Sequence, residues 1–179
     1  FQLAQIPLYV LLGVCCGLMS YYFTEVNSIV GKFVKNISTQ YKRWGFAGML
    51  LGVMIFVFPP LYGEGYEGMM ALMHGNVENL FDNSLFYKFR GIEWVAIVYV
   101  IAIMFGKVVA MATTNAAGGV GGTFAPSLFV GAFMGATVAL VCNALFDWHV
   151  SVVSFTLVGM AGVMAGVMNA PLTSIFLIA

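Results

Sequence analysis

Residues 118–126 read Gly118-Gly119-Val120-Gly121-Gly122-Thr123-Phe124-Ala125-Pro126, and this glycine-rich stretch decides the fold. It interrupts an apolar region, 108–146, that contains no Asp, Glu, Lys or Arg. One helix over that region would be about 58 Å long at a rise of about 1.5 Å per residue, whereas the hydrocarbon core of a bilayer is about 30 Å thick. Because glycine is costly in a helix interior and adopts backbone angles that other residues avoid, the four glycines predict where the helix breaks.

A new helix is predicted to begin directly after this break. Pro126 suits the first turn of a helix, where no N–H is needed. A helix that starts near Thr123 directs its unpaired N–H groups and the positive end of its dipole into the break. The break contains no basic or metal-ligating side chain, so an anion there would be held by main-chain amides and hydroxyl groups. The same glycines could instead form only a tight turn between packed membrane helices.

The composition is typical of a polytopic membrane protein, because 61% of the residues are hydrophobic and only 8% are charged. Seven basic side chains balance seven acidic ones, and a net charge of zero argues against a nucleic-acid partner. The cysteines, Cys15, Cys16 and Cys142, have neither metal-like spacing nor a clear disulfide partner. The chain lacks an initial Met and stops inside an apolar run, so we expect residues 1–179 to be an incomplete piece of one transmembrane domain, with no soluble domain.

The first half of the chain predicts two full spans and a short helix. Residues 1–24 are charge-free and long enough to cross. Residues 25–43 read as a cytoplasmic loop by the positive-inside rule, because four of them are basic: Lys32, Lys35, Lys42 and Arg43. Residues 44–62 predict a return span that ends at Pro59-Pro60. A short helix over 69–73 follows, and it need not cross the bilayer.

The second half predicts further spans and a second break. Residues 94–114 form a span interrupted only by Lys107, and an ionisable residue within a span is a functional hypothesis because an unpaired buried charge is costly. Lys107 lies near one end of this span, however, and could extend to the interface. Residues 124–146 predict the next helix, with glycines spaced for close helix packing at Gly131 and Gly135. A polar turn is predicted at Asp147-Trp148-His149.

Residues 150–179 are again charge-free and too long for one span, which requires another interruption. Asn169-Ala170-Pro171 supplies it, with Asn169 suited to cap a helix that has Pro171 in its first turn. Gly162 and Gly166 repeat the close-packing spacing just before this point. The predicted fold is therefore all-α, a polytopic membrane protein with tilted, broken helices, some of which span only part of the bilayer.

Three segments resemble motifs of the CLC family of chloride channels and proton/chloride exchangers. They are Gly122-Thr123-Phe124-Ala125-Pro126, Gly159-Met160-Ala161-Gly162 and Asn169-Ala170-Pro171-Leu172-Thr173. The first is similar to the G-x-F-A-P signature at the start of the family's anion-lining helix. The resemblance extends through nearly all of the chain and is weakest between about residues 70 and 91.

The resemblance implies an anion site and a set of partners. The main-chain N–H groups of Thr123 and Phe124 would contribute to the central anion site, within a motif that also contains Gly121, Gly122, Ala125 and Pro126. A basic residue occupies a similar position to Lys107 in the family, which suggests a vestibule charge that steers anions. The implied partners are chloride, protons in an exchanger, the lipid bilayer, the remainder of the same chain and a second subunit that the helix from Pro171 would face.

The resemblance also shows what the chain lacks. The family's G-S-G-x-P serine segment, its G-x-E-G-P gating glutamate segment and its site tyrosine do not occur in these residues. The position that is often isoleucine in the signature is Thr123 here. Since the main chain would bind the ion, we expect this substitution to change anion binding little. This chain would form one wall of an anion pathway and could not conduct alone.

Transmembrane transport of chloride or a similar small anion is the predicted function. Partial charges of about +0.5 at a helix end offer moderate, reversible sites for an anion, and they favour anions without selecting chloride among them. The alternatives are another secondary transporter with broken helices and a purely structural membrane domain. We expect no enzyme activity, no cofactor and no metal site, since no catalytic triad, metal spacing or phosphate loop occurs. The expected location is a prokaryotic inner membrane.

Overall fold

The computed structural model describes residues 5–82, 84–89, 91–146 and 148–178, and these form helices joined by turns, without strands. The all-α prediction is confirmed. The α-helices in this part of the chain are α1 (Ile6–Lys35), α2 (Gln40–Val57), α3 (Tyr66–Met73), α4 (Glu93–Ala117), α5 (Phe124–Phe146), α6 (Val152–Met168) and α7 (Pro171–Ile178). Three short 3₁₀-helices lie between α2 and α4: η2 (Pro59–Leu61), η3 (Val77–Phe81) and η4 (Tyr87–Phe89).

Helix α1 is longer than the predicted first span. The start of the predicted 1–24 span lies outside the described residues, but the helix continues past Thr24 to Lys35. The prediction of a loop over 25–43 is therefore wrong, and only residues 36–39 connect α1 to α2. Lys32 and Lys35 occupy the last turn, where positive charge interacts favourably with the negative end of the helix dipole, so these basic residues favour helix there.

Helix α2 is shorter than the predicted second span. It ends at Val57 and not at Tyr62, because Pro59 and Pro60 cannot continue an α-helix and instead form the 3₁₀-helix η2. Among the described residues, the helices long and apolar enough to cross a membrane are α1, α4 from Trp94 to Ala117, and α5. Helix α2 is not in this group, and the predicted bound at residue 62 is wrong, whereas a crossing of the bilayer by α2 stays a prediction.

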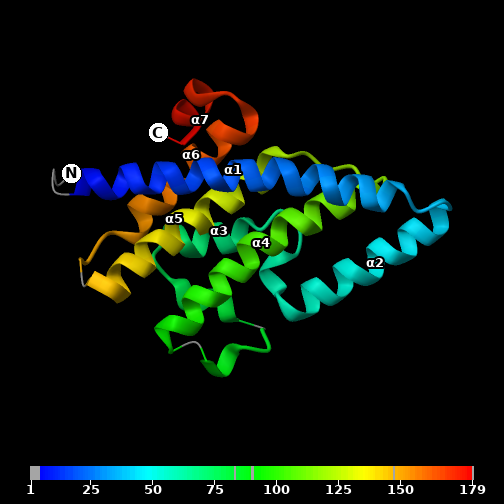
Figure 1. Ribbon diagram of the computed structural model, residues 1–179. Helices are drawn as coiled ribbons and strands as arrows, with labels where there is room; N and C mark the ends of the chain where they lie inside the picture. The colour runs from blue at the N-terminus through cyan, green and yellow to red at the C-terminus, as the bar shows by residue number, and fades with distance from the viewer. Residues whose placement is uncertain (1–4, 83, 90, 147, 179) are drawn as a thin grey trace.

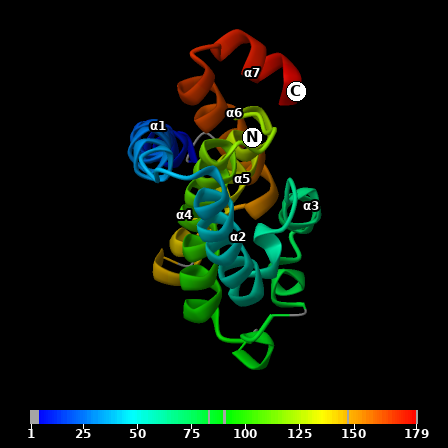
Figure 2. The same cartoon turned by 90° about the vertical axis from the view of Figure 1, so that its right-hand side faces the viewer.

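Helix α5 lies at the centre of the molecule, where it contacts α1, α3, α4 and α6 (Figures 1 and 2). The predicted close-packing glycines of α5 do pack, and they face α6. A Cβ on Gly131 would lie 2.5 Å from the carbonyl oxygen of Gly159, and a Cβ on Gly135 would overlap the carbonyl of Phe155. Only glycine allows the two backbones to approach this closely, so α5 is held firmly against α6.

The second glycine pair, on α6, packs against α1. A Cβ on Gly162 would lie 3.0 Å from the sulfur of Cys16, and a Cβ on Gly166 would overlap the hydroxyl of Ser20. The Ser20 hydroxyl donates to the carbonyl of Val163 at 3.1 Å. Helices α1, α5 and α6 thus form one closely packed group that supports the start of α5.

Helix α7 lies at the edge of the molecule in both ribbon views (Figures 1 and 2). The predicted second break is confirmed, but Asn169 has a different role from the predicted one. It ends α6 in the left-handed conformation, with φ of 53°, and does not cap α7. Ala170 precedes α7 instead, and its carbonyl accepts hydrogen bonds from the main chain and hydroxyl of Ser174. Asparagine is one of the few residues that tolerates this conformation.

Candidate functional site

The break after α4 begins with a left-handed glycine. Gly118 has φ of 102°, and its N–H donates to the carbonyl of Asn115 at 3.2 Å. The N–H of Gly119 donates to the carbonyl of Thr114 at 2.9 Å. These two bonds satisfy carbonyls at the helix end, a role for which glycine is favoured because it lacks a Cβ. The predicted position of the break is therefore confirmed.

The remaining glycines allow the chain to fold back along the end of α4. A Cβ on Gly119 would lie 2.8 Å from the methyl group of Thr114, and one on Gly121 would lie 2.6 Å from the amide oxygen of Asn115. Gly122 has more room, since a Cβ there would meet only the nitrogen of Phe124 at 3.9 Å. Close contact with the main chain of Thr114 therefore requires glycine at 119, and the backbone angles require it at 118. A Cβ at 121 would instead require the Asn115 side chain to move.

Helix α5 begins at Phe124, one residue after Thr123. Its first main-chain hydrogen bond runs from the N–H of Ser127 to the carbonyl of Thr123 at 3.0 Å. The N–H groups of Phe124 and Ala125 precede that bond and have no partner within the helix, and Pro126 has no N–H to satisfy. The unpaired donors at the start of α5 are therefore those of Phe124 and Ala125, and the predicted roles of the Thr123 and Phe124 amides in binding an anion stay predictions.

A cavity of about 590 Å³ lies beside the start of α5. The residues that line it come from three parts of the chain and include Leu61, Gly63, Glu64, Lys107, Asn115, Gly121, Gly122, Phe124, Ala125 and Pro126. Thr123 does not line this cavity, and its hydroxyl lies 3.7 Å from the sulfur of Met168, on α6. Apart from Thr123, the structure thus brings the signature residues and Lys107 to one space.

Lys107 is buried, with 3% of its surface exposed, so the alternative that it extends to the interface is wrong. Its ammonium donates to the carbonyls of Gly63 at 2.7 Å and Leu61 at 3.2 Å. The nitrogen also lies 4.7 Å from the ring centre of Phe129, a cation–π contact with α5. Within the described residues no carboxylate is in ion-pair contact with Lys107, and Glu64, which lines the same cavity, is exposed.

Two contributors to this site were not found in the sequence. The carbonyls of Leu61 and Gly63 lie at and just after η2 and hold the Lys107 ammonium, although they are 46 and 44 residues away along the chain. The indole N–H of Trp44, on α2, donates to the carbonyl of Ala117 at 2.9 Å and so holds the end of α4 where the break begins. The residues that meet in each contact are far apart in the sequence, so no local sequence pattern predicts these contacts.

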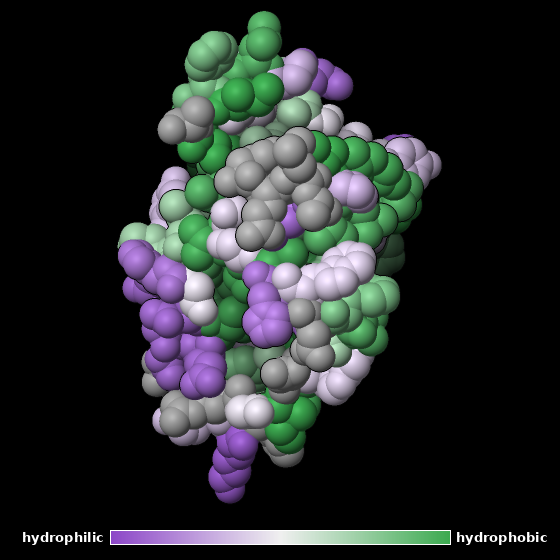
Figure 3. Space-filling view, turned by 90° about the vertical axis from the view of Figure 1, so that its left-hand side faces the viewer, coloured by the Kyte–Doolittle hydropathy of each residue, from purple (hydrophilic) through white to green (hydrophobic). Residues whose placement is uncertain are grey.

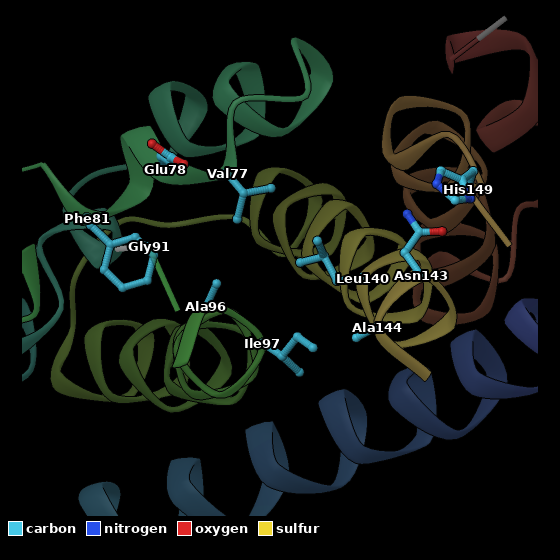
Figure 4. A pocket seen from close by; sticks show the side chains of 10 residues that line it. All are labelled: Val77, Glu78, Phe81, Gly91, Ala96, Ile97, Leu140, Asn143, Ala144 and His149. Carbon is cyan, nitrogen blue, oxygen red and sulfur yellow. The ribbon is translucent and has the colours of Figure 1, made fainter. Parts of the chain in front are cut away.

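A second cavity, of about 510 Å³, lies near the other end of α5 (Figure 4). Its lining includes Glu78 of η3, Ile97 of α4, Asn143 of α5 and His149. The Asn143 side chain is already occupied, because it accepts from the N–H of Val150 at 2.7 Å and donates to its carbonyl at 3.1 Å. This end of α5 carries the negative end of the helix dipole, which disfavours an anion.

The described residues contain no group of three His, Cys, Asp or Glu side chains placed to hold a metal ion. The cysteines Cys15, Cys16 and Cys142 are free, and the last two are buried. Of the predicted polar turn Asp147-Trp148-His149, Asp147 lies outside the described part of the chain, and Trp148 and His149 lie in the non-helical connection between α5 and α6.

This fold and site define a class of protein, an integral membrane protein with broken helices. Its unpaired helix-start amides and its buried ammonium lie beside one cavity. The chain belongs to the voltage-gated chloride channel family, because the family model described as "Voltage gated chloride channel" matches residues 1–179. It is 30% identical to chloride channel protein CLC-e of Arabidopsis thaliana over 97% of this chain and 25% of that protein. It is 26% identical to the H(+)/Cl(-) exchange transporter ClcA of Salmonella agona over 96% of this chain and 34% of that protein.

The chain spans about a quarter of the length of CLC-e and about a third of the length of ClcA. It is also 30% identical to chloride channel protein CLC-f of Arabidopsis thaliana, over 98% of this chain and 22% of that protein. The relatives thus include both channels and exchangers.

Proposed function

We propose that this chain forms part of a membrane pathway for chloride, in which the main-chain N–H groups of Thr123 and Phe124 help to bind the ion. The observation that supports this most directly is the start of α5, where the unpaired amide of Phe124 lies beside a cavity of about 590 Å³. Thr123 does not line this cavity, and its part in the proposal rests on the resemblance to the family. An anion that leaves water must find replacement donors, because a bare charge in a low-dielectric medium is very unstable. Helix-start amides supply such donors without a full opposite charge that would hold the ion too tightly.

Lys107 has a supporting role in this proposal. Its ammonium is buried beside the same cavity, and both of its hydrogen-bond acceptors are neutral carbonyls. No carboxylate forms a close ion pair with it within the described residues, although Glu64 lines the same cavity and interacts with it electrostatically. The ammonium raises the potential in the cavity, and Glu64 offsets part of that effect. Lys107 would attract anions toward the start of α5 without having to contact them.

The proposal extends to the setting of the chain. Residues 1–179 would form part of one transmembrane domain whose other parts complete the pathway. Transport, and not catalysis, is the role that the relatives' names favour, and it needs no cofactor. Helix α7 would face a second subunit, and a prokaryotic inner membrane remains our proposed location, with protons as a second transported ion if the protein is an exchanger like ClcA.

The test removes the main-chain N–H of Phe124 in the full-length protein, which is reconstituted into liposomes. Phe124→Pro removes a single unpaired N–H at a position where proline is well tolerated in a helix, and Phe124→Ala removes the same ring but keeps the N–H. A hydrogen bond to a charged group contributes about 1.5–3 kcal/mol, so we expect the chloride affinity of Phe124→Pro to be lower than that of Phe124→Ala by a factor of about ten or more.

Two outcomes would contradict the proposal. Equal chloride flux and affinity in Phe124→Pro and Phe124→Ala would remove the amide from the site and favour a structural role for the glycine-rich segment. Flux of a cation or an organic anion in place of chloride would indicate another secondary transporter with broken helices.

A further inference from the structure

The corner where α1 ends and α2 begins is strongly basic. Four basic residues lie within residues 32–43, and no acidic residue occurs between Glu25 and Glu64. Arg43 is used internally, because it donates to the carbonyls of Lys35 at 2.9 Å and Ile37 at 3.2 Å and so closes the end of α1. Lys32, Lys35 and Lys42 are exposed, and within the described residues no carboxylate pairs with them.

Two of these lysines border a groove between α1 and the end of α4. The groove has a volume of about 390 Å³, and we call it the basic groove. Its polar lining consists of Asn27, Ser28, Lys32 and Lys35 from α1 and Asn115 from α4. Ser28, Lys32 and Lys35 follow a spacing that places them on one face of a helix. The Asn115 amide already donates to the sulfur of Met111 at 3.1 Å. The two ammonium groups, with the Ser28 hydroxyl and the Asn27 amide nearby, are a suitable set for a phosphate group.

The basic groove lies where a membrane interface is expected. Helix α1 has 30 residues, which correspond to about 45 Å, so it is longer than a hydrocarbon core of about 30 Å. Residues 6–24 are charge-free, and the last turns of α1 therefore extend into the headgroup region. Exposed aromatic side chains surround this corner: Phe33, Tyr41 and Trp44 are 63%, 78% and 50% exposed. Such side chains are typical of the interface.

We propose that the basic groove binds the phosphate headgroup of an anionic phospholipid. The uncompensated charge matches an anionic headgroup, and the exposed aromatic residues match the adjoining acyl and glycerol region. A soluble anion would use the lysines but would gain nothing from the aromatic surround. The occupant is therefore a lipid of the bilayer, in the cytoplasmic leaflet by the positive-inside rule. Figure 1 places this corner and the end of α4 at the same end of the molecule.

The first test measures lipid retention by native mass spectrometry of the full-length protein. Wild-type protein should retain phosphatidylglycerol in preference to phosphatidylcholine. Each lysine near an anionic headgroup strengthens the attraction about fivefold, so we expect K32Q/K35Q to bind phosphatidylglycerol at least about tenfold more weakly. K32R/K35R keeps the charge and should retain the lipid. K88Q makes the same change on η4, away from the groove, and should behave as wild type.

A second measurement needs no change to the lysines. In nanodiscs, phosphatidylglycerol brominated on its acyl chains should quench the emission of Trp44 more than brominated phosphatidylcholine at the same mole fraction, with W44F used to subtract the other tryptophans. The proposal is overturned if the two lipids quench equally, if K32Q/K35Q retains as much phosphatidylglycerol as K88Q, or if soluble glycerol phosphate displaces the lipid at equal concentration. The last result would identify a site for soluble phosphates.

Discussion

Two interruptions of apolar helices lie side by side in this molecule, and they lead to different structures. The first separates α4 from α5, and the second separates α6 from α7. They are in contact, because the hydroxyl of Thr123 lies 3.7 Å from the sulfur of Met168. Both begin with a left-handed residue, Gly118 at the first and Asn169 at the second. The same local signal therefore precedes both helix starts.

The helices that begin after the two interruptions differ in length and burial. Helix α5, after the first, has 23 residues and is buried along most of its length, with a cavity beside its start. Helix α7, after the second, has 8 residues, and Leu172 and Phe176 on it are 71% and 80% exposed. The hydrophobic surface of α7 is visible at the top of Figure 3. A helix start becomes a candidate ion site only where packing fixes the helix and leaves space at its end.

The largest effect is expected from loosening α5. Gly135→Leu places a side chain where a Cβ would already overlap the carbonyl of Phe155, so α5 and α6 must separate. We expect a loss of about 3 kcal/mol or more in the stability of the full-length protein, with loss of chloride flux. Thermal unfolding in detergent and flux from liposomes would measure the two effects.

Two matched substitutions control this prediction. Gly17→Ala, on α1, adds a Cβ that meets nothing within 4 Å, and Phe176→Leu changes an exposed side chain on α7. Both should leave the stability of the subunit nearly unchanged. If Phe176→Leu were as damaging as Gly135→Leu, the contrast between a fixed α5 and a peripheral α7 would be lost.

Lys107→Met should have the next largest effect. The substitution keeps an unbranched side chain of similar length but leaves the carbonyls of Leu61 and Gly63 without their donor. Leaving buried carbonyls unpaired should cost about 2 kcal/mol in stability. If the charge also attracts anions, flux at low chloride should fall more than flux at saturating chloride, and the difference should shrink as ionic strength rises.

Lys107→Gln separates the two roles, because it keeps a donor and removes the charge. It should recover part of the stability and none of the flux at low chloride. Flux at low chloride that equals wild type in both variants would reject steering and leave Lys107 as a purely structural link between η2, α4 and α5.

Local chemistry made the helix interruptions predictable from the sequence. Glycine, asparagine and proline act within a few residues, so both breaks and the place where α5 starts could be located without coordinates. The environment of Lys107 could not be predicted, because its acceptors are main-chain carbonyls 44 and 46 residues away. Whether a charged residue near a helix end extends outward or is buried depends on such distant partners.

The same limit explains two wrong predictions about helix ends. The positive-inside rule predicts that Lys32 and Lys35 lie in a cytoplasmic loop, yet an exposed helix end accommodates them well. The prediction for Asn169 failed because asparagine serves both ends of helices, and only the backbone angles distinguish the two uses. The sequence therefore predicted correctly which residues lie at each break, but it predicted less well what each of them does there.

Substitutions of the two left-handed residues should have a smaller effect on stability. Gly118→Ala puts a Cβ on a residue with φ of 102° and should lower the free energy of unfolding by about 1–2 kcal/mol. Asn169→Gly relaxes the residue at the second interruption and should change stability by less than about 0.5 kcal/mol. If thermal unfolding shows the same loss of stability in the two variants, then the two interruptions are under the same backbone constraint.

The smallest effect is expected from Trp44→Phe, which tests whether α2 holds the first interruption. The variant keeps an aromatic ring but loses the hydrogen bond from the indole to the carbonyl of Ala117. An exposed hydrogen bond of this kind contributes about 0.5–1 kcal/mol, so amide hydrogen exchange in residues 115–123 should become about twofold to fivefold faster. Exchange at the start of α7 should not change, because the hydrogen bond of Trp44 is to the end of α4. Faster exchange at both helix starts would mean that Trp44 supports the whole fold, whereas unchanged exchange at both would mean that the glycines hold the first interruption without help from α2.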